Sequence, residues 1–476
     1  MPILIPALIL LPVLGAAICY LSSSPRLRTA VLVVTAVTHV AGTGWIWSTR
    51  DRSAAVGWFA VDALGLVVLT VVSLVFLAIA VYSVAFLAAE RAPGRRVYIV
   101  CLLAFLAAAS MVTLAHHMAL VWIGMEATTL ALAPLVFFHR DRRSLEAAWK
   151  YLVLSSVGIA LALFGTFFLA AAQVHGRPLI LEDLMTSAGT LRPGLLRAAF
   201  VFLLVGYGTK MGLAPLHSWK PDTYGEAPSP VAGLMAGALT SCAFLGLART
   251  AQVMTAAGQG GFTRPPLLAL GLISLAISAG FMIAQTDLKR LLAYSSVEHM
   301  GILAIALGIG GAGGYGAALH VLNNGLIKPA MFLAVGNVVL LSQTSEAAAT
   351  RGLLLRAPLT GGLMLAGLFA VTGSPPFGLF ISEFTILGAA FHVGLAWVAI
   401  ATLLLVAIVF VGMARMILGV VYGQVPDGAS SLRESLPIVA GPVTLAGLVL
   451  MLGLHLPGPL QTVLAEAARS LGGVAP

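Results

Sequence analysis

The sequence predicts an all-α, polytopic membrane protein of about 14 transmembrane helices, because apolar windows of helix-spanning length recur along the chain. Only 9% of the 476 residues are charged and 60% are hydrophobic. So few polar residues cannot cover the surface of a water-soluble protein of this size. No stretch is long and polar enough to form a soluble catalytic domain. The chain is therefore expected to lie in lipid from end to end.

The expected helices are the apolar runs between charged or turn-forming residues. Their ranges are 2–21, 28–48, 62–88, 97–115, 118–138, 146–174, 195–217, 228–252, 264–286, 291–310, 314–341, 357–388, 390–422 and 435–457. The first run has no basic leader and no small-residue cleavage site, so we expect it to be retained as a helix. Lys and Arg gather in alternate loops, which predicts that both termini lie on the non-cytoplasmic side of the inner (plasma) membrane.

The seventh and the twelfth expected helices contain glycine and proline in mid-span. Gly212 and Pro215 interrupt the seventh, and Gly373, Pro375 and Pro376 interrupt the twelfth. Proline removes a backbone donor and clashes with the preceding turn, so both helices should break inside the membrane. Two broken helices in corresponding places predict two inverted five-helix repeats, a pattern of transporters. The expected divisions are 1–96 (helices 1–3), 97–252 (first repeat, helices 4–8), 264–422 (second repeat, helices 9–13) and 423–476 (C-terminal helix and tail).

Composition also excludes several kinds of site. Cys19, Cys101 and Cys242 each stand alone in an apolar segment, so we expect no iron–sulfur cluster, structural zinc or other cofactor in this chain. The formal net charge of +9 arises in loops. There it favours membrane orientation and anionic lipid headgroups over a nucleic-acid partner.

Ionisable residues within the spans are the candidate functional groups, because a charge at the centre of a membrane helix costs about 2.5–3.5 kcal/mol on insertion scales. Glu126 lies in the fifth span, and Lys210 lies in the seventh just before its break. Opposite charges attract strongly in a low dielectric, so a change in their separation would load or release a proton. The alternative is a static pair that fastens two helices together.

The eleventh span carries a polar stripe. His320, Asn324 and Lys328 recur every four residues and share one helical face. Histidine, lysine and bound water can pass protons along such a stripe, although a helix-packing hydrogen bond also explains the histidine. Glu383 is the only acidic residue of the twelfth span. We expect it to accept protons at the exit of the path, the alternative being a carboxylate held by the freed amides of the broken helix.

Two polar segments at helix ends add further candidates. His217, Asp222 and Glu226 follow the first break. One interpretation is that they collect protons or ions at a surface; the alternative is that they are cap and turn residues of a solvated loop. Glu298 and His299 lie deeper in the tenth span than the charged residues at its boundary. Their depth makes them secondary candidates for ion transfer.

Taken in order, these motifs resemble the antiporter-like membrane subunits shared by respiratory complex I, the multisubunit Na⁺/H⁺ antiporters and the group 4 membrane-bound nickel–iron hydrogenases. The resemblance covers roughly residues 118–418 and rests on Gly-Met-Glu126, Lys210 with Pro-Leu-His-Ser-Trp-Lys-Pro-Asp222, Glu226-Ala-Pro-Ser-Pro230, Asp287-Leu-Lys-Arg-Leu-Leu-Ala-Tyr-Ser-Ser296, and the stripe from His320 to Lys328. Ser-Val-Glu298-His-Met-Gly and Glu-Ala-Pro-Ser-Pro are most similar to the hydrogenase-4 component F branch, and Glu383 is similar to the branch with glutamate in the twelfth helix.

The resemblance implies a proton-translocating or Na⁺-translocating subunit of a redox-driven complex, itself without a catalytic centre. Nickel–iron and iron–sulfur centres would then lie in soluble partner subunits, with further membrane subunits alongside. Carried onto this sequence, the resemblance makes Glu126 and Lys210 the first half of a buried path, Lys328 its centre and Glu383 its far end.

This sequence departs from the family pattern at two places. The eighth helix of many relatives carries a lysine or histidine, whereas the aligned stretch here offers only Thr240 and Ser241, so we expect water to bridge the two halves there. Asn324 stands where a histidine is often found, and its amide cannot carry a proton.

Three other functions remain open from sequence. The main alternative is a subunit of a multisubunit cation/proton antiporter driven by ion gradients. Another is a membrane partner of a soluble metalloprotein that couples ion flow to inorganic-carbon capture. A third is a scaffold that no longer conducts ions, which the missing base in the eighth helix would allow.

Overall fold

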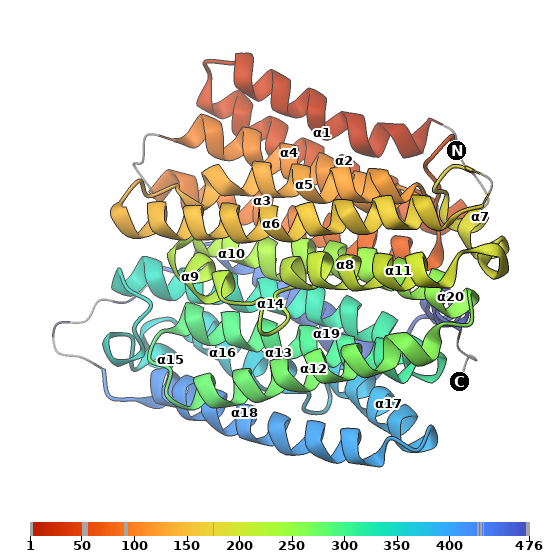
Figure 1. The fold of residues 1–476 in the computed structure, drawn as a ribbon. Helices are drawn as coiled ribbons and strands as arrows, with labels where there is room; N and C mark the ends of the chain where they lie inside the picture. The colour runs from red at the N-terminus through yellow and green to blue at the C-terminus, as the bar shows by residue number, and fades with distance from the viewer. Residues whose placement is uncertain are drawn as a thin grey trace.

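The computed structural model describes residues 3–49, 56–89, 94–174, 176–425, 428, 431 and 433–472. Within these ranges the chain is helical, and its only β contacts are isolated bridges. Most helices run roughly alongside one another in a single bundle (Figure 1). The start of the first helix and the last helix lie at the same end of this bundle (Figure 1).

The helices before the middle of the chain are α1 (Leu4–Leu21), α2 (Pro25–Thr49), α3 (Ala63–Ala89), α4 (Arg95–Leu114), α5 (Met118–Val136), α6 (Arg142–Ala172), α7 (Leu181–Thr186), α8 (Pro193–Met211), α9 (Trp219–Glu226), α10 (Ser229–Leu234) and α11 (Thr240–Ala256). Those that follow are α12 (Gly260–Ile283), α13 (Leu288–Ile309), α14 (Gly314–Ser342), α15 (Leu353–Arg356), α16 (Pro358–Val371), α17 (Gly378–His392), α18 (Ala396–Tyr422), α19 (Leu436–Leu454) and α20 (Gly458–Ser470). A π-helical turn, Met235–Leu239, joins α10 to α11 in one span.

The number of crossings agrees with the sequence prediction. Thirteen helices of the described chain are long and apolar enough to cross a membrane, and α16 and α17 are shorter apolar helices. End to end, α16 and α17 supply one more crossing, which gives the expected total of about 14.

Both predicted helix breaks are present. α8 ends at Met211, where Gly212 adopts the left-handed conformation (φ 78°), and α9 begins only at Trp219. α16 ends at Val371, and Gly373 (φ 60°) lies in the turn before α17. Glycine adopts this conformation without the steric cost that a side chain brings, so it is suited to ending a helix in mid-membrane.

Some helix ends differ from the sequence prediction. α6 begins at Arg142 and not near residue 146, because Asp141 caps it: the Asp141 carboxylate accepts from the Ser144 amide at 2.7 Å. The helix expected at 390–422 begins instead at Ala396, after a turn in which Gly394 has a φ of 76°. A polar cap and a left-handed turn determine where these two helices begin. A hydropathy pattern detects neither feature.

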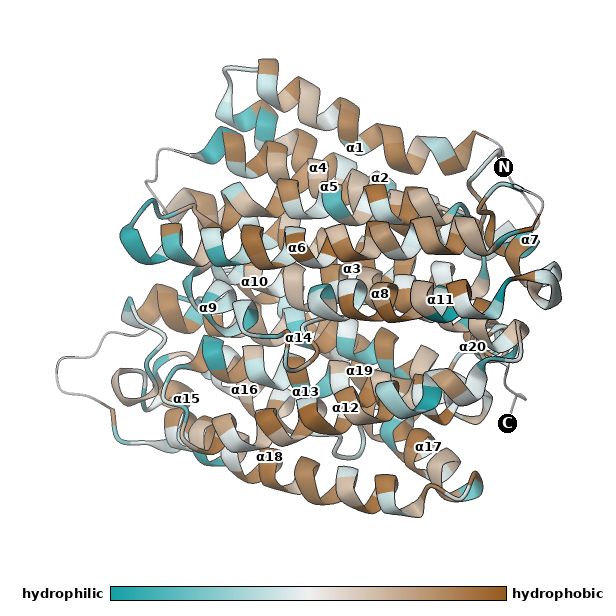
Figure 2. Cartoon of the chain, viewed as in Figure 1, coloured by the Kyte–Doolittle hydropathy of each residue, from teal (hydrophilic) through white to brown (hydrophobic). Residues whose placement is uncertain are grey.

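Helices differ greatly in how deeply they lie in the bundle. In the most apolar window of each span, all residues of α10–α11 and 94% of those of α13 are buried, against 33% for α2 and α18. Hydrophilic residues gather at the two ends of the bundle, and hydrophobic residues dominate between them (Figure 2). The enclosed helices α10–α11 and α13 can therefore carry polar side chains out of contact with lipid.

Candidate functional site

The first buried cluster surrounds Lys210, in the last turn of α8. Its ammonium group donates to the Thr129 hydroxyl at 2.6 Å and to the Tyr151 hydroxyl at 3.0 Å. The same nitrogen lies 4.7 Å from the centre of the Tyr151 ring, a distance at which cation–π attraction applies. Thr129 in turn donates to a Glu126 carboxylate oxygen at 3.3 Å, and Ser156 donates to the other oxygen at 3.4 Å. A single hydroxyl therefore connects lysine to glutamate.

This geometry refines the sequence expectation of a Glu126–Lys210 pair. Among the described residues the two side chains make no direct salt bridge, because Thr129 stands between them. Thr129 lies one turn after Glu126 on α5, so both point toward the same neighbour. Close packing of α6 on α8 brings Tyr151 to Lys210: a Cβ added at Gly206 would lie 2.7 Å from the Gly158 carbonyl oxygen.

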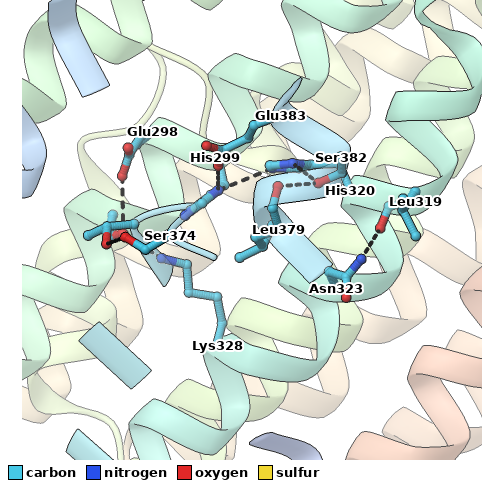
Figure 3. Close-up of polar contacts among 12 residues, drawn as sticks. Glu298, His299, Leu319, His320, Asn323, Lys328, Ser374, Leu379, Ser382 and Glu383 are labelled. Carbon is cyan, nitrogen blue, oxygen red and sulfur yellow. Dashed lines mark hydrogen bonds and ion pairs between the residues drawn. The ribbon is translucent and has the colours of Figure 1, made fainter. Parts of the chain in front are cut away.

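The second buried cluster repeats this order of groups around Lys328 of α14. The Lys328 ammonium donates to the Ser295 hydroxyl at 2.5 Å, and Ser295 donates to a Glu298 oxygen at 3.2 Å. Ser295 and Glu298 lie one turn apart on α13, and all three side chains are sealed from solvent. Figure 3 shows Glu298 and Lys328 approaching the same point from opposite sides. The second cluster is again lysine, hydroxyl and carboxylate.

A row of polar groups lies beside the second cluster and begins at His299, which follows Glu298 in the sequence. The Nδ1 atom of His299 lies 3.1 Å from Nε2 of His320, whose own Nδ1 is 3.0 Å from the Ser382 hydroxyl. A Glu383 oxygen lies 3.9 Å from Nδ1 of His299. Figure 3 shows these side chains of α13, α14 and α17 in one row. Both histidines are fully buried, whereas the Glu383 side chain is 13% exposed, so the row leads from the sealed interior toward an accessible carboxylate.

The row also has the donor atoms of a metal site. One ligand atom from each of His299, His320 and Glu383 lies within 4.8 Å of the others, and two imidazoles with a carboxylate can bind zinc. Here, however, the facing nitrogens of the two histidines are hydrogen-bonded to each other. The arrangement therefore fits a hydrogen-bonded chain between two imidazoles, one as donor and one as acceptor.

Lys220 is a buried cation that the sequence analysis missed. It lies on α9 and is fully buried, and its described hydrogen bonds go only to backbone carbonyls: Met211 at 2.6 Å and Ser296 at 3.4 Å. Met211 directly follows Lys210 of the first cluster. Ser296 directly follows Ser295 of the second. Lys220 thus links the edges of the two clusters.

The local fold accounts for this position. After the break at Gly212 the chain folds back, and α9 re-enters the protein instead of forming a solvated loop. A Cβ at Gly212 would lie 2.6 Å from Cδ of Lys220, so glycine both ends α8 and makes room for the lysine. The only sign of Lys220 in the sequence is its place in Trp-Lys-Pro next to a helix break. Hydropathy assigns such a segment to a surface turn, so it does not predict a buried lysine.

The other predicted residues lie outside the two clusters. His217 is partly buried beside Tyr294, with ring centres 6.4 Å apart, and its Nδ1 has no described partner. Thr240 and Ser241 are buried, but both hydroxyls donate to carbonyls of their own helix at 2.6 Å. Asn324 is buried, and neither of its amide atoms has a partner among the described residues. Buried polar atoms without protein partners are places where bound water is expected.

The acidic residues after the first break belong to the protein surface. Asp222 accepts from Lys150 at 2.8 Å and from Arg290 at 2.9 Å. It lines, with Glu226, a polar cavity of about 400 Å³ at the ends of α6, α9 and α13.

Comparison with known proteins places this geometry in a family. Residues 115–410 match the family model described as NADH:quinone oxidoreductase/Mrp antiporter, TM. The chain belongs to this antiporter-like family. The hydrogenase-4 component F homolog of Methylacidiphilum infernorum (isolate V4) is 34% identical over 400 residues, which cover 81% of this chain and 83% of the relative. The family predicted from the sequence motifs is thereby confirmed, and with it a multi-pass membrane protein.

Solved structures extend the likeness beyond the matched residues. A chain of the membrane-bound sulfane sulfur reductase, an archaeal respiratory membrane complex, has a TM-score of 0.89 at 23% identity, covering 99% of this chain and 98% of its own. A chain of respiratory complex I from Thermus thermophilus has a TM-score of 0.80 at 26% identity, covering 98% of this chain and 99% of its own. The antiporter-like fold therefore includes the helices that flank residues 115–410.

Proposed function

We propose that this chain is the proton-translocating subunit of a redox-driven membrane complex, with Na⁺ as the alternative ion. The observation that carries the proposal is the repeated lysine–hydroxyl–carboxylate cluster, around Lys210 and around Lys328, with Lys220 between the two. A buried cation in a membrane span is energetically costly, and such residues usually mark ion or proton pathways. Two such arrangements with the same chemical order favour a shared task over chance.

The energetics of each cluster match that task. Widening a lysine–carboxylate separation from about 4 to 8 Å costs roughly 2 kcal/mol at an effective dielectric of 20. Moving one elementary charge against about 100 mV requires some 2.3 kcal/mol. A small movement of α5 against α8, or of α13 against α14, would therefore change the protonation of Lys210 or Lys328 by a useful amount. The hydroxyls of Thr129 and Ser295 keep each lysine near its carboxylate without joining them irreversibly.

The proposed path runs from the first cluster through Lys220 to the second, and then to His299, which contacts both His320 and Glu383. Lys220 provides the bridge that the sequence analysis assigned to water near Thr240 and Ser241. Water beside Asn324 and His217 would complete the path where side chains do not meet. The two broken helices, α8 and α16–α17, lie next to Lys220 and Glu383, as expected for inverted repeats that place ion sites at interrupted helices.

The same proposal assigns orientation and partners. The ends of α4, α6 and α13 that carry Arg95, Arg142 and Lys289 lie together at one end of the bundle, which we assign to the cytoplasm. Both termini would then lie outside the cytoplasm. We further propose other membrane subunits as neighbours and soluble redox subunits, with nickel–iron or iron–sulfur centres, as the source of energy.

The test combines purification with reconstitution. The complex containing the chain is isolated in mild detergent, its components are identified by mass spectrometry, and ion uptake is measured in vesicles. Lys210→Met should abolish uptake, whereas Arg197→Met, which removes an exposed charge from the same helix, should leave it intact. Unimpaired uptake by Lys210→Met would refute the proposed path. Co-purification of small membrane proteins alone would favour a gradient-driven antiporter.

A further inference from the structure

A groove at one end of α2, α3 and α4 lies away from the buried clusters. Its volume is about 490 Å³, and its wall is apolar, formed by Ala30, Val33, Val84, Leu87 and Ile99. Arginines complete the lining: Arg26, Arg28 and Arg95. Among the described residues that line it there is no carboxylate. The groove therefore combines an apolar wall with basic side chains at one end.

Arg28 is the unusual member of this lining. Its side chain is only 9% exposed, and one guanidinium nitrogen donates to the Ser23 carbonyl at 2.9 Å. Its Nε atom is buried and has no partner among the described residues. A buried guanidinium is costly unless an anion neutralises it, and Arg28 forms no salt bridge within the described chain. The arginine thus points to a ligand with negative oxygens.

We propose that this groove binds an anionic phospholipid, with the phosphodiester at Arg28 and Arg26 and an acyl chain along the apolar wall. All three helices are membrane spans, so the groove opens in the bilayer, where lipid is at high concentration. Basic pockets between transmembrane helices are suited to anionic headgroups. The N-terminal ends of α2 and α4 meet here, and their helix dipoles add to the attraction for phosphate.

Charge and shape together favour a lipid over other occupants. A free phosphate ion would satisfy the arginines but would leave the apolar wall empty. A neighbouring apolar helix would cover the wall but would leave the charges of Arg26 and Arg28 unneutralised. An anionic phospholipid satisfies both halves of the groove. This site is independent of the proposed ion path.

The test compares lipid retention by the purified full-length protein, measured by native mass spectrometry after exchange into phosphatidylglycerol or phosphatidylcholine. The paired change Arg26→Gln and Arg28→Gln should weaken retention of phosphatidylglycerol by roughly 30-fold, as expected for two basic contacts at a membrane surface. Arg177→Gln with Arg192→Gln removes the same charge beside α7, at the opposite end of the bundle, and should change nothing. Equal retention by both variants would overturn the proposal.

Two further measurements test whether the lipid binds in this groove and whether its headgroup charge alone is enough for binding. Ala30→Trp leaves every arginine in place but fills the groove from its exposed wall, so it should also release phosphatidylglycerol. If Ala30→Trp retains the lipid fully, the groove is not the binding site. Glycerol 3-phosphate supplies the headgroup charge alone and should not displace the lipid at equal concentration. Displacement by it would show a simple anion site and would overturn the lipid assignment.

Discussion

The Lys210 cluster and the Lys328 cluster share an order of groups but differ in what continues from them. In the first, Glu126 is only partly buried, and its contacts end at Thr129 and Ser156. In the second, Glu298 is sealed, and two histidines extend the polar row to Glu383. The comparison shows that the same order of groups ends at a partly buried carboxylate in one place and lies beside a row of buried histidines in the other.

The largest expected effect concerns Lys220, the residue proposed to join the two clusters. Lys220→Met removes the buried cation that bonds to the backbone beside each cluster. It should slow ion uptake by at least about 100-fold, the usual scale for loss of a proton-transferring group. The control is the paired change Thr240→Val and Ser241→Ala, whose hydroxyls bond only to their own helix. If the control were as damaging as Lys220→Met, water near the eighth span and not Lys220 would be the bridge.

The histidine row distinguishes the second cluster from the first. His320→Gln should reduce ion uptake by about 10- to 100-fold, because glutamine keeps a hydrogen bond but cannot carry a proton. Initial uptake rates in vesicles provide the measurement. The matched control is His392→Gln, at the last position of α17 and away from the row. Equal rates for the two variants would mean that His320 only packs helices.

The bridging hydroxyls test what the two clusters have in common. Thr129→Val and Ser295→Ala each remove the link between lysine and carboxylate, and we expect losses of about tenfold in uptake, the equivalent of one hydrogen bond. Thr129→Ser and Ser295→Thr retain a hydroxyl and should recover most of the rate. An undiminished rate in Thr129→Val would leave the first cluster without a functional hydroxyl.

The smallest effect on transport is expected at a closed ion pair outside both clusters. Asp62, just before α3, accepts from Arg249 at 2.6 Å and lies 3.1 Å from His116. Burial opposes ionisation of Asp62, but attraction to Arg249 and His116 outweighs it and holds the pKa of the carboxyl well below its usual range. Asp62→Asn should lower the free energy of unfolding by about 1–3 kcal/mol at pH 7 and change the rate of ion uptake less than about twofold.

The sign of the pH effect follows from that pKa. A carboxyl with a depressed pKa in the folded protein stabilises the fold above its unfolded pKa of about 3.9, and this stabilisation is lost as the pH falls further. The stability difference between the wild type and Asp62→Asn should therefore be constant near neutrality and shrink in acid. Unfolding followed at several pH values checks this, and a difference that grew in acid would be inconsistent with it.

Much of this fold was readable from sequence because membranes impose strong rules. Long apolar runs predicted the crossings, and glycine with proline predicted both breaks. Ordered motifs predicted the family. The sequence also drew attention to Glu126, Lys210, Lys328 and Glu383, which the structure places within polar clusters, whereas their roles remain proposals.

The contacts between helices could not be predicted in the same way. Thr129 and Ser295 are ordinary hydroxyl residues in sequence, and only packing shows that each lies between a lysine and a glutamate. Lys220 looked like part of a surface turn because hydropathy cannot show that the chain folds back after Gly212. Glu298 and His299 are only secondary candidates from sequence, because periodicity alone does not reveal a facing side chain on another helix.

The most direct test of the central claim is a double-mutant comparison of ion uptake. The account holds that the two clusters lie on one path, so Lys210→Met and Lys328→Met should each abolish uptake about as completely as the two changes together. Residues that act in series show this strong departure from additivity. If instead each single variant kept about half the rate and only the double variant lost it, the clusters would be two separate paths and the account would be wrong.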